Sequence, residues 1–250
     1  MQRRDAERRA RIVGWLFIAT IVFSIPGALL YGPLLNHKHY IVGAGSDTQI
    51  ALGAALEILT AVAGIGTAVV LYPLAKRHSP SVALAYVGTR VLESTMIVVG
   101  IVSVLAVVRL RRDVASAPGT DSASLILAGQ QLKAVHDMAF LLGPSFCAAI
   151  GNGILLGSLM YRSQLVPPRL ALIGVIGGPL ALIAAAGALF NVYHQNSTAQ
   201  GILTVPEIIW EASFGIYLVV RGFRAPALAA LGVERTEAIV RPGPAAPQQA

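Results

Sequence analysis

VALAYVGTRVLESTMIVVGIVSVLAVV, residues 82–108, decides the fold class of this chain. The run is long enough to cross a bilayer, because about 20 residues that rise 1.5 Å each span a hydrocarbon core about 30 Å thick. Only Arg90 and Glu93 in it are charged, and a charge at bilayer depth costs about 2.5–3.5 kcal/mol on insertion scales. Such residues usually face the interior of a helix bundle. We therefore expect a polar feature inside this protein.

The composition predicts a polytopic membrane protein. Hydrophobic residues make up 55% of the chain and charged residues 12%, whereas soluble domains have roughly 25% charged residues. The apolar runs are continuous and lack the period of two that a membrane barrel requires. The predicted fold is all-α, a bundle of six transmembrane helices. The expected spans are residues 12–31, 50–74, 82–108, 133–160, 169–191 and 201–222.

The basic residues predict the orientation. The formal net charge is +7, but the cations flank the spans and form no basic face, so no nucleic-acid partner is expected. With both termini in the cytoplasm, thirteen basic residues lie inside and five outside, in agreement with the positive-inside rule. The third loop, RLRRDVASAPGTDSAS at 109–124, argues the other way. Arginine outnumbers lysine 16 to 3, which favours a bacterial protein and hence the plasma (inner) membrane.

Three parts are expected along the chain. Residues 1–11 form a basic cytoplasmic N-terminus that precedes an uncleaved first helix, residues 12–222 form the transmembrane domain, and residues 223–250 form a disordered cytoplasmic tail, since the last part is rich in Ala and Pro. Thr120 or Ser122 is expected to cap a helix that leads into the fourth span. Cys147, the single cysteine, is expected to be a small packing residue.

Small residues and prolines mark where helices pack or bend. Gly153 with Gly157, and Gly174 with Gly178, have the spacing that lets membrane helices approach closely. Pro144, Pro179 and Pro206 interrupt backbone hydrogen bonding in spans four, five and six. Broken helices often border cavities, although a static kink is the simpler interpretation of each proline.

The polar residues inside the spans are the candidates for function. Glu57 is expected in the outer half of span two, and Arg90 and Glu93 near the middle of span three, where i,i+3 spacing pairs them. Glu211 has a suitable depth to be the second partner of Arg90. Glu207 and Glu211 share one face of span six, and because two adjacent carboxylates do not both ionise easily in a low dielectric, at least one is expected to carry a proton.

A second polar group opens span four. Asp137 is expected to pair with Lys133 one turn earlier. His136 points about 100° away from Asp137 on an ideal helix, so the two are not expected to share one ligand geometry. Asn152 is expected to hydrogen-bond across to another helix. No metal site is predicted inside the spans; an external site at the loop histidines His37, His39 and His194 stays open as an alternative.

Several segments resemble one family. They are ARIVGWLFIATIVFSI at 10–25, TRVLES at 89–94, HDMAFLLGP at 136–144, SQLVPPRLALIGVIGGPL at 163–180 and PEIIWEASFGIYLVVRGF at 206–223. In this order they are similar to the family called domain of unknown function 4386. The resemblance covers nearly the whole membrane region and not the tail. It implies a small multi-span prokaryotic membrane protein and supplies no activity, cofactor or catalytic residue.

Three classes of function remain open, and the catalytic residues and cofactor stay unknown. The first hypothesis is a polar cluster that binds a small ligand, a lipid headgroup or a proton, built from Glu57, Arg90, Glu93, His136, Asp137, Glu207 and Glu211. The second is a membrane-embedded enzyme that uses a carboxylate as general base on a lipid-like substrate. The third is a structural or accessory subunit of a membrane complex. The expected partners are the lipid bilayer, a lipid or small-molecule ligand and a further copy of the chain in a homo-oligomer.

Overall fold

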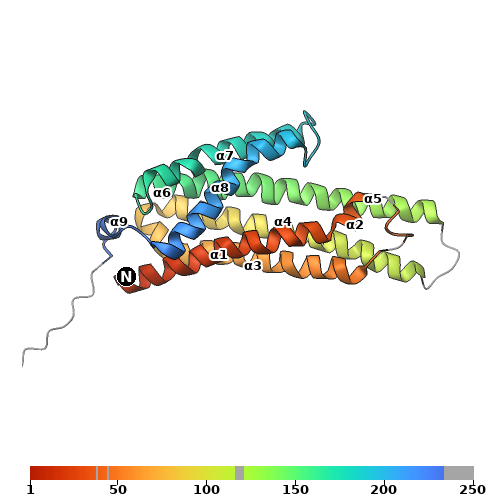
Figure 1. The fold of residues 1–250 in the computed structure, drawn as a ribbon, viewed down its shortest axis with the longest axis horizontal. Coiled ribbons are helices and arrows are strands. Elements are labelled where there is room, and N and C mark those ends of the chain that lie inside the picture. Colours follow the sequence, from red (N-terminus) through yellow and green to blue (C-terminus); the bar gives the residue numbers. More distant parts are fainter. Residues whose placement is uncertain (38, 44, 116–120, 234–250) are drawn as a thin grey trace, which may run out of the picture.

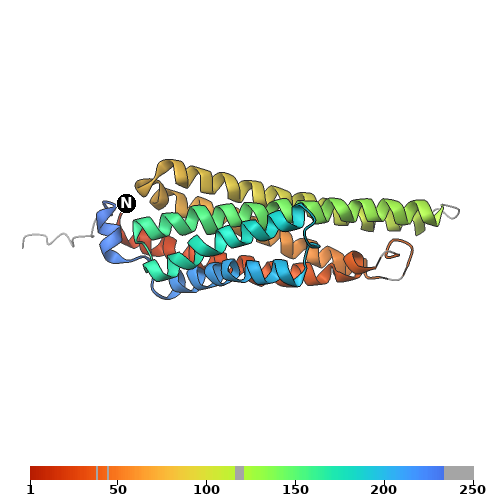
Figure 2. The same ribbon diagram turned by 90° about the horizontal axis from the view of Figure 1, so that it is seen from above.

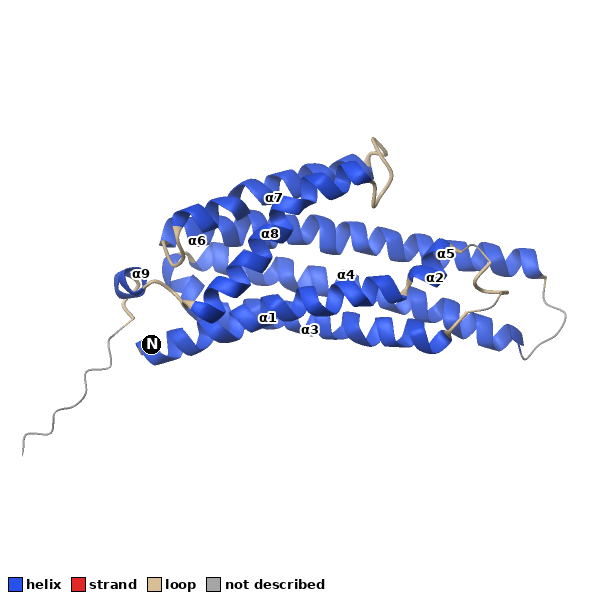
Figure 3. Ribbon diagram, in the orientation of Figure 1, coloured by secondary structure: helices blue, strands red, loops and turns tan. Residues whose placement is uncertain are grey.

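The computed structural model describes residues 1–37, 39–43, 45–115 and 121–233, and this part of the chain is helical without a strand (Figure 3). Six helical segments are long and apolar enough to cross a membrane, which confirms the predicted class. They are α1 (Arg3–Leu30), α3 (Asp47–His78), α4 (Pro80–Ala115), the fourth span (Ser122–Ser163), α7 (Pro168–Leu189) and α8 (Thr198–Val220). The chain is therefore a multi-pass membrane protein.

The fourth span is longer than predicted and changes its helical type along its length. It consists of α5 (Ser122–Phe140), two π-helical segments η1 (Leu141–Cys147) and η2 (Ala149–Leu156), and α6 (Gly157–Ser163). Pro144 lies in η1, where its missing N–H removes one backbone hydrogen bond. Wider π-helical turns occur frequently at functional sites. The broken backbone predicted near Pro144 is thus a segment of altered helical pitch.

Asp121 begins the fourth span. Its carboxylate accepts hydrogen bonds from the backbone N–H groups of Ala123 and Ser124 and from the Ser124 hydroxyl, and these bonds, the hydroxyl first, hold the pKa of Asp121 below its usual range. The prediction of Ser122 as the cap was wrong by one residue, because a carboxylate accepts two N–H groups at once. Thr120, the other predicted cap, lies outside the described residues.

The six spans form a closed ring. Helix α1 packs between α3 and α8, α3 packs on α4, α4 packs on the fourth span, and α7 closes the ring between the fourth span and α8 (Figures 1 and 2). The end that holds the N-terminus and α9 (Ala225–Ala230) is called the terminal end here. The other end, where residues 31–46 join α1 to α3, is called the loop-one end. There α4 and α5 extend beyond the remaining helices.

The two predicted small-residue pairs pack against each other. Gly153 meets Gly178, and Gly157 meets Gly174, across the contact of the fourth span with α7. A Cβ atom on Gly157 would lie 3.0 Å from the carbonyl carbon of Gly174, so a larger residue would push the backbones apart. This close approach confirms the packing role that the spacing indicates.

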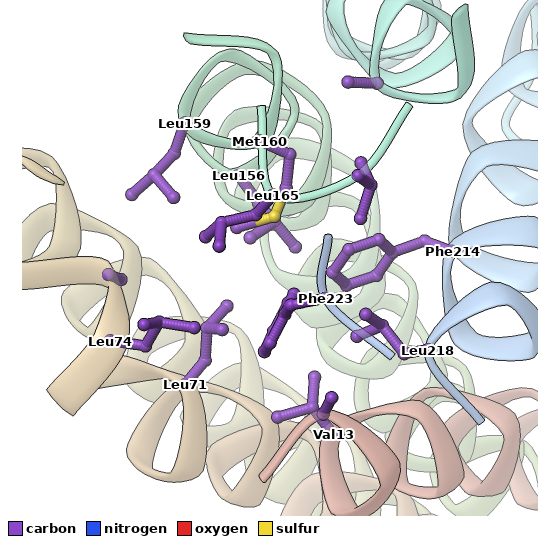
Figure 4. Packing of buried hydrophobic residues seen from close by; sticks show 14 of the residues in the cluster. Val13, Leu71, Leu74, Leu156, Leu159, Met160, Leu165, Phe214, Leu218 and Phe223 are labelled. Carbon is purple, nitrogen blue, oxygen red and sulfur yellow. The ribbon is translucent and has the colours of Figure 1, made fainter. Parts of the chain in front are cut away.

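A large apolar core fills the terminal end. Figure 4 shows side chains from α1, α3, the fourth span and α8 meeting there, among them Val13, Leu71, Met160 and Phe214. Helix α9 adds Ala227 and Leu228 to this core, and Arg77 donates to the carbonyl oxygen of Leu231. The tail predicted to be disordered from residue 223 onward therefore has a helical, packed first part, because its apolar residues cover the bundle end. Residues 234–250 lie outside the described part.

One arginine of the third loop holds the loop-one end together. Arg111 lies on α4, forms an ion pair of 2.7 Å with Asp47, and donates to the carbonyl oxygens of Gly43 and Gly45. Arg112 also pairs with Asp47, at 2.9 Å. The positive charges that opposed the predicted orientation thus have a structural role in fixing the first loop to α4; Lys38 of this loop lies outside the described residues.

Candidate functional site

A cavity of about 190 Å³, with five charged side chains in a mostly apolar wall, lies inside the ring of helices. Each of the six spans contributes to its wall. Five of the seven predicted site residues line it, namely Glu57, Arg90, Glu93, Glu207 and Glu211. The remaining wall is formed by Thr20, Ile21, Ser24, Thr60, Ile97, Phe140, Pro144, Ser145, Ala148, Ala149, Ala181, Thr204 and Ile208. The structure thus brings the carboxyl groups of the consecutive helices α3 and α4 together with those of α8, which lies far from them in sequence.

Arg90 and Glu93 form the predicted ion pair. Nη1 of Arg90 lies 2.6 Å from Oε2 of Glu93, and the two side chains are 3% and 10% exposed. Nε of Arg90 also donates to the carbonyl oxygen of Gly64 on α3, at 3.3 Å. The guanidinium fits there because Gly64 has no side chain: a Cβ atom would lie 2.8 Å from Nη2. The charge of Arg90 is therefore paired within the protein, and its hydrogen bond to Gly64 joins α4 to α3.

Glu211 has a hydrogen-bond partner in Asn152. Its Oε1 accepts a hydrogen bond of 2.5 Å from Nδ2 of Asn152, which confirms that Asn152 bonds across helices. Among the described residues the ion pair of Arg90 is with Glu93. Glu211 lies beyond ion-pair distance of Arg90 but close enough to interact with its charge, in agreement with the prediction of a second partner. The rotation of α8 determines this position of Glu211. Trp210 packs over Gly174 and donates through Nε1 to the Asn152 carbonyl oxygen, which fixes this rotation.

Glu207 has no hydrogen-bond partner for either carboxyl oxygen within the described part of the chain. Its side chain is buried, and the residue is only 4% exposed. Two glycines make room for the Glu207 side chain. A Cβ atom on Gly153 would lie 2.6 Å from Oε2 of Glu207, and one on Gly177 would lie 3.0 Å from the same oxygen. Buried polar groups are normally hydrogen-bonded, because an unpaired one costs about 1–3 kcal/mol. Glu207 is therefore a well-packed acceptor that lacks a donor.

Glu57 on α3 is the second under-used carboxyl group. It is 2% exposed, and its Oε2 finds no donor among the residues that the structure describes. The Glu57 side chain packs against Gly27 of α1, where a Cβ atom would lie 3.0 Å from Cγ of Glu57. The hydroxyl of Tyr31, at the end of α1, is also buried; it has no hydrogen bond within 3.5 Å in the described residues but is close enough to the Glu57 carboxyl group to interact with it. Tyr31 was not predicted as a site residue.

His136 and Asp137 lie toward the loop-one end and do not line the cavity. Lys133 and Asp137 form the predicted ion pair, at 2.5 Å. His136 contacts Asp137 as well, with Nδ1 3.3 Å from Oδ1. The expectation that the two residues do not share one ligand geometry stays a prediction. His136 also stacks on Phe140, which does line the cavity.

Several other residues have plain packing roles or do not form sites. Cys147 is a buried free thiol. Thr20, Thr60 and Thr204 each donate to a carbonyl oxygen of their own helix. The described residues hold no group of three or more histidine, cysteine, aspartate and glutamate side chains arranged to bind a metal, and this search covers His37, His39 and His194.

The family follows from a comparison of the whole membrane region. The family model "Domain of unknown function (DUF4386)" matches residues 12–222. The chain belongs to the DUF4386 family. A search of curated proteins and a search of solved structures find no match. The matched region includes every residue of the cavity wall in this DUF4386 protein.

Tyr31, Phe140 and the hydroxyl residues of the wall were missed at the sequence level. Nothing in their spacing separates them from ordinary core residues, since tyrosine, phenylalanine and threonine are common in membrane helices. Only the rotation of α1 and of the fourth span in the DUF4386 fold directs Thr20, Ser24 and Phe140 to the cavity.

Proposed function

We propose that this membrane protein binds a small ligand that carries an ammonium group, in the cavity inside the ring of spans. The observation that carries the proposal is Glu207, whose two buried carboxyl oxygens lack a donor among the described residues. An ammonium group offers up to three N–H donors and a positive charge. A buried carboxylate is stable when such a partner reaches it.

The charge balance of the cavity favours a cation over an anion. Four carboxyl groups and one guanidinium line the wall. Arg90 is already committed to Glu93 and to the Gly64 carbonyl oxygen, and Asn152 donates to Glu211. The buried carboxyl oxygens without a hydrogen-bond donor in the described residues belong to Glu207 and, at Oε2, to Glu57. A phosphate inside the cavity would be repelled by the carboxyl groups and would meet a guanidinium whose charge is already paired with Glu93, so a cation suits this wall better than a phosphate.

The size and the apolar walls restrict the ligand further. A volume of about 190 Å³ is below the roughly 300–1,000 Å³ of drug-sized sites and exceeds the roughly 10–15 Å³ that one water needs. Ile97, Ile208 and Phe140 supply apolar surface for a short alkyl chain. Aromatic cages for quaternary ammonium groups use several rings, whereas Phe140 is the one aromatic residue of this wall. A primary or secondary amine therefore suits the cavity best.

The ammonium group has two natural sources, a free alkylamine and the ethanolamine headgroup of a lipid. Both present the same donor to Glu207.

The enzymatic hypothesis gains no separate support, because the threonine hydroxyls of the wall bond to their own helices and not to a carboxylate. The bias of basic residues toward the terminal end supports cytoplasmic termini, and the arginine-rich composition supports a bacterial plasma membrane.

The proposal is tested by calorimetric titration of ethylamine into the delipidated protein in detergent. Replacement Glu207→Gln removes the charge that the ammonium group meets. A charge-assisted hydrogen bond contributes about 1.5–3 kcal/mol, so affinity is expected to fall roughly 10–100-fold. Glu7→Gln is the matched control, since Glu7 lies at the terminal end in a half-exposed ion pair with Arg3. Equal affinity of the Glu207→Gln variant and the wild type would refute the proposal.

A second arm separates the two sources. The protein is placed in nanodiscs of phosphatidylethanolamine or of phosphatidylcholine, and ethylamine is titrated into each. A lipid headgroup that occupies the cavity competes with ethylamine in the first lipid and not in the second. Equal binding in both lipids indicates a free amine as the ligand.

A further inference from the structure

We propose that the protein binds an anionic phospholipid, with the lipid phosphate in a pocket lined by arginines at the terminal end of the bundle. The pocket lies between the start of α1 and the end of α8 and has a volume of about 600 Å³. It is separate from the cavity inside the ring, because the two have no lining residue in common. The lipid site is therefore independent of the ammonium ligand proposed above.

The wall of this pocket carries an excess of positive charge. Its arginines are Arg3, Arg11, Arg221 and Arg224, and its acidic residue is Glu7. Glu7 pairs with Arg3 at 2.8 Å. The guanidinium groups of Arg11 and Arg221 have no hydrogen-bond or ion-pair partner in the part of the chain that the structure describes, and both residues are exposed. Their N–H donors are thus free for an anion, and a guanidinium group matches the geometry of phosphate oxygens.

The packing of α1 on α8 brings these arginines to one place. Arg3, Glu7 and Arg11 are spaced by four residues, so they lie along one face of α1. The start of α1 lies beside the end of α8 (Figures 1 and 2). The two backbones approach closely at Gly14 and Gly215, where a Cβ atom on Gly14 would lie 2.7 Å from the Gly215 carbonyl oxygen. This approach places the basic residues of the two helices on the wall of one pocket.

The turn after α8 fixes the far side of the pocket. Gly222 directly follows Arg221 and has a φ of +67°, a left-handed conformation that glycine adopts readily. Phe223 is buried in the apolar core of the terminal end. The backbone N–H of Arg224 donates to the carbonyl oxygen of Leu165 at 2.9 Å. The backbone that carries the two arginines is therefore held by packing and hydrogen bonding.

The pocket lies at the depth of lipid headgroups and continues into an apolar groove. Arg11 is the last charged residue before the apolar part of α1, and Arg221 follows the apolar end of α8. Trp15, one turn after Arg11, is 60% exposed, and tryptophan is enriched at membrane interfaces. The groove lies between α7 and α8 and has a volume of about 450 Å³. Tyr217, Val220 and Arg221 line both the pocket and the groove.

A phospholipid matches both parts of this surface. Its phosphate carries the negative charge that the arginines attract, and its acyl chain covers the apolar groove. Basic pockets between membrane helices bind anionic lipid headgroups in this way. The ammonium group of a zwitterionic headgroup would be repelled by the same arginines, so an anionic headgroup is preferred. A soluble phosphate would use the pocket and leave the groove empty.

Native mass spectrometry of the full-length protein in mild detergent tests the lipid site. The protein is titrated with phosphatidylglycerol or with phosphatidylcholine of the same acyl chains, and tighter binding of phosphatidylglycerol is expected. The double variant Arg11→Gln with Arg221→Gln removes the two unpaired guanidinium groups. Its affinity for phosphatidylglycerol is expected to fall roughly 10–30-fold. Both residues are exposed and unpaired within the described residues, so this variant is expected to fold.

The double variant Arg8→Gln with Arg162→Gln is the matched control. Both are exposed arginines, on α1 and α6 at the terminal end, and neither lines the pocket or the groove. The control removes the same net charge, and its affinity for phosphatidylglycerol is expected to change little. Equal loss of affinity in the two double variants would overturn the proposal, because diffuse attraction would then explain the binding. Equal affinity of the wild type for the two lipids would overturn it as well.

Glycerol phosphate distinguishes a lipid from a soluble phosphate as the ligand. It carries the phosphate group without the acyl chains. At equal concentration it is expected to leave phosphatidylglycerol bound, since it gains nothing from the groove between α7 and α8. Displacement of the lipid under these conditions would overturn the assignment of a phospholipid to this site.

Discussion

Because Arg90 and Glu93 form a buried ion pair, we expect the loss of either residue to destabilise the protein, and the loss of Glu93 to destabilise it more. In Glu93→Leu the guanidinium stays buried and charged, because arginine does not lose its proton in proteins. Its remaining hydrogen bond within the described part of the chain is the one of 3.3 Å from Nε to the Gly64 carbonyl oxygen. Removal of one partner of a buried pair costs about 3–5 kcal/mol. Glu211 also interacts with the charge of Arg90, but it lies beyond ion-pair distance and accepts a hydrogen bond of 2.5 Å from Asn152, so it replaces the lost acid only in part.

Arg90→Met leaves the Glu93 carboxyl group without its partner, and the expected loss of stability is smaller than in Glu93→Leu. A carboxyl group without a partner in a low dielectric takes up a proton instead of staying charged. The remaining loss is that of the hydrogen bonds to Glu93 and Gly64, about 1–3 kcal/mol. The double variant with both replacements buries no charge at this place, and its stability is expected to be close to that of the wild type.

Cys147 supplies the assay. It is the single cysteine and is buried, so a thiol-reactive fluorogenic maleimide reports its exposure when the bundle unfolds on heating. With roughly 2–4 °C per kcal/mol for a chain of this size, Glu93→Leu is expected to lower the melting temperature by about 6–20 °C. The order expected is Glu93→Leu lowest, Arg90→Met intermediate and the double variant highest. A double variant less stable than both single variants would refute the reasoning.

Three further predictions concern packing, the first loop and protonation. Gly178→Ala places a Cβ atom 2.6 Å from the backbone nitrogen of Ile154 and is expected to lower the free energy of unfolding by about 1–3 kcal/mol. In Gly88→Ala the new Cβ atom meets nothing within 4 Å, so this variant is expected to stabilise α4 by about 0.5–1 kcal/mol. Equal melting temperatures of the two variants would contradict this prediction. Arg111→Met removes the bonds that fix the first loop, so hydrogen exchange is expected to accelerate in that loop and not in the bundle core, and acceleration throughout the bundle would count against a local role. An empty cavity favours a neutral acid, so ethylamine binding is expected to release a proton, and a binding enthalpy that does not vary with the ionisation heat of the buffer would argue otherwise.

The sequence was sufficient for what depends on local spacing and composition. The six spans follow from the length of the apolar runs. Arg90 with Glu93, and Lys133 with Asp137, are three and four residues apart on one helix, so helical geometry alone brings them together. The close contact of the glycine pairs follows from small-residue spacing.

Contacts between helices were harder to predict, because they depend on rotation and crossing that no local pattern determines. Glu211 was assigned to Arg90 by depth, and the two interact electrostatically, but depth could not predict the hydrogen bond that Glu211 accepts from Asn152. Tyr31 was not noticed, since its importance comes from a neighbour on α3. The helical start of the tail was missed because alanine and proline dominate its composition, while its burial depends on the apolar end of the bundle.

Native mass spectrometry of the full-length protein in mild detergent can detect an amine bound in the cavity. We expect that the wild type retains or takes up an amine-bearing species, identified by its mass, and that Glu207→Gln loses this species while Glu7→Gln keeps it. A wild-type protein that gains no mass when ethylamine is added, or a Glu207→Gln variant with the same occupancy as the wild type, would show that Glu207 does not hold an ammonium group.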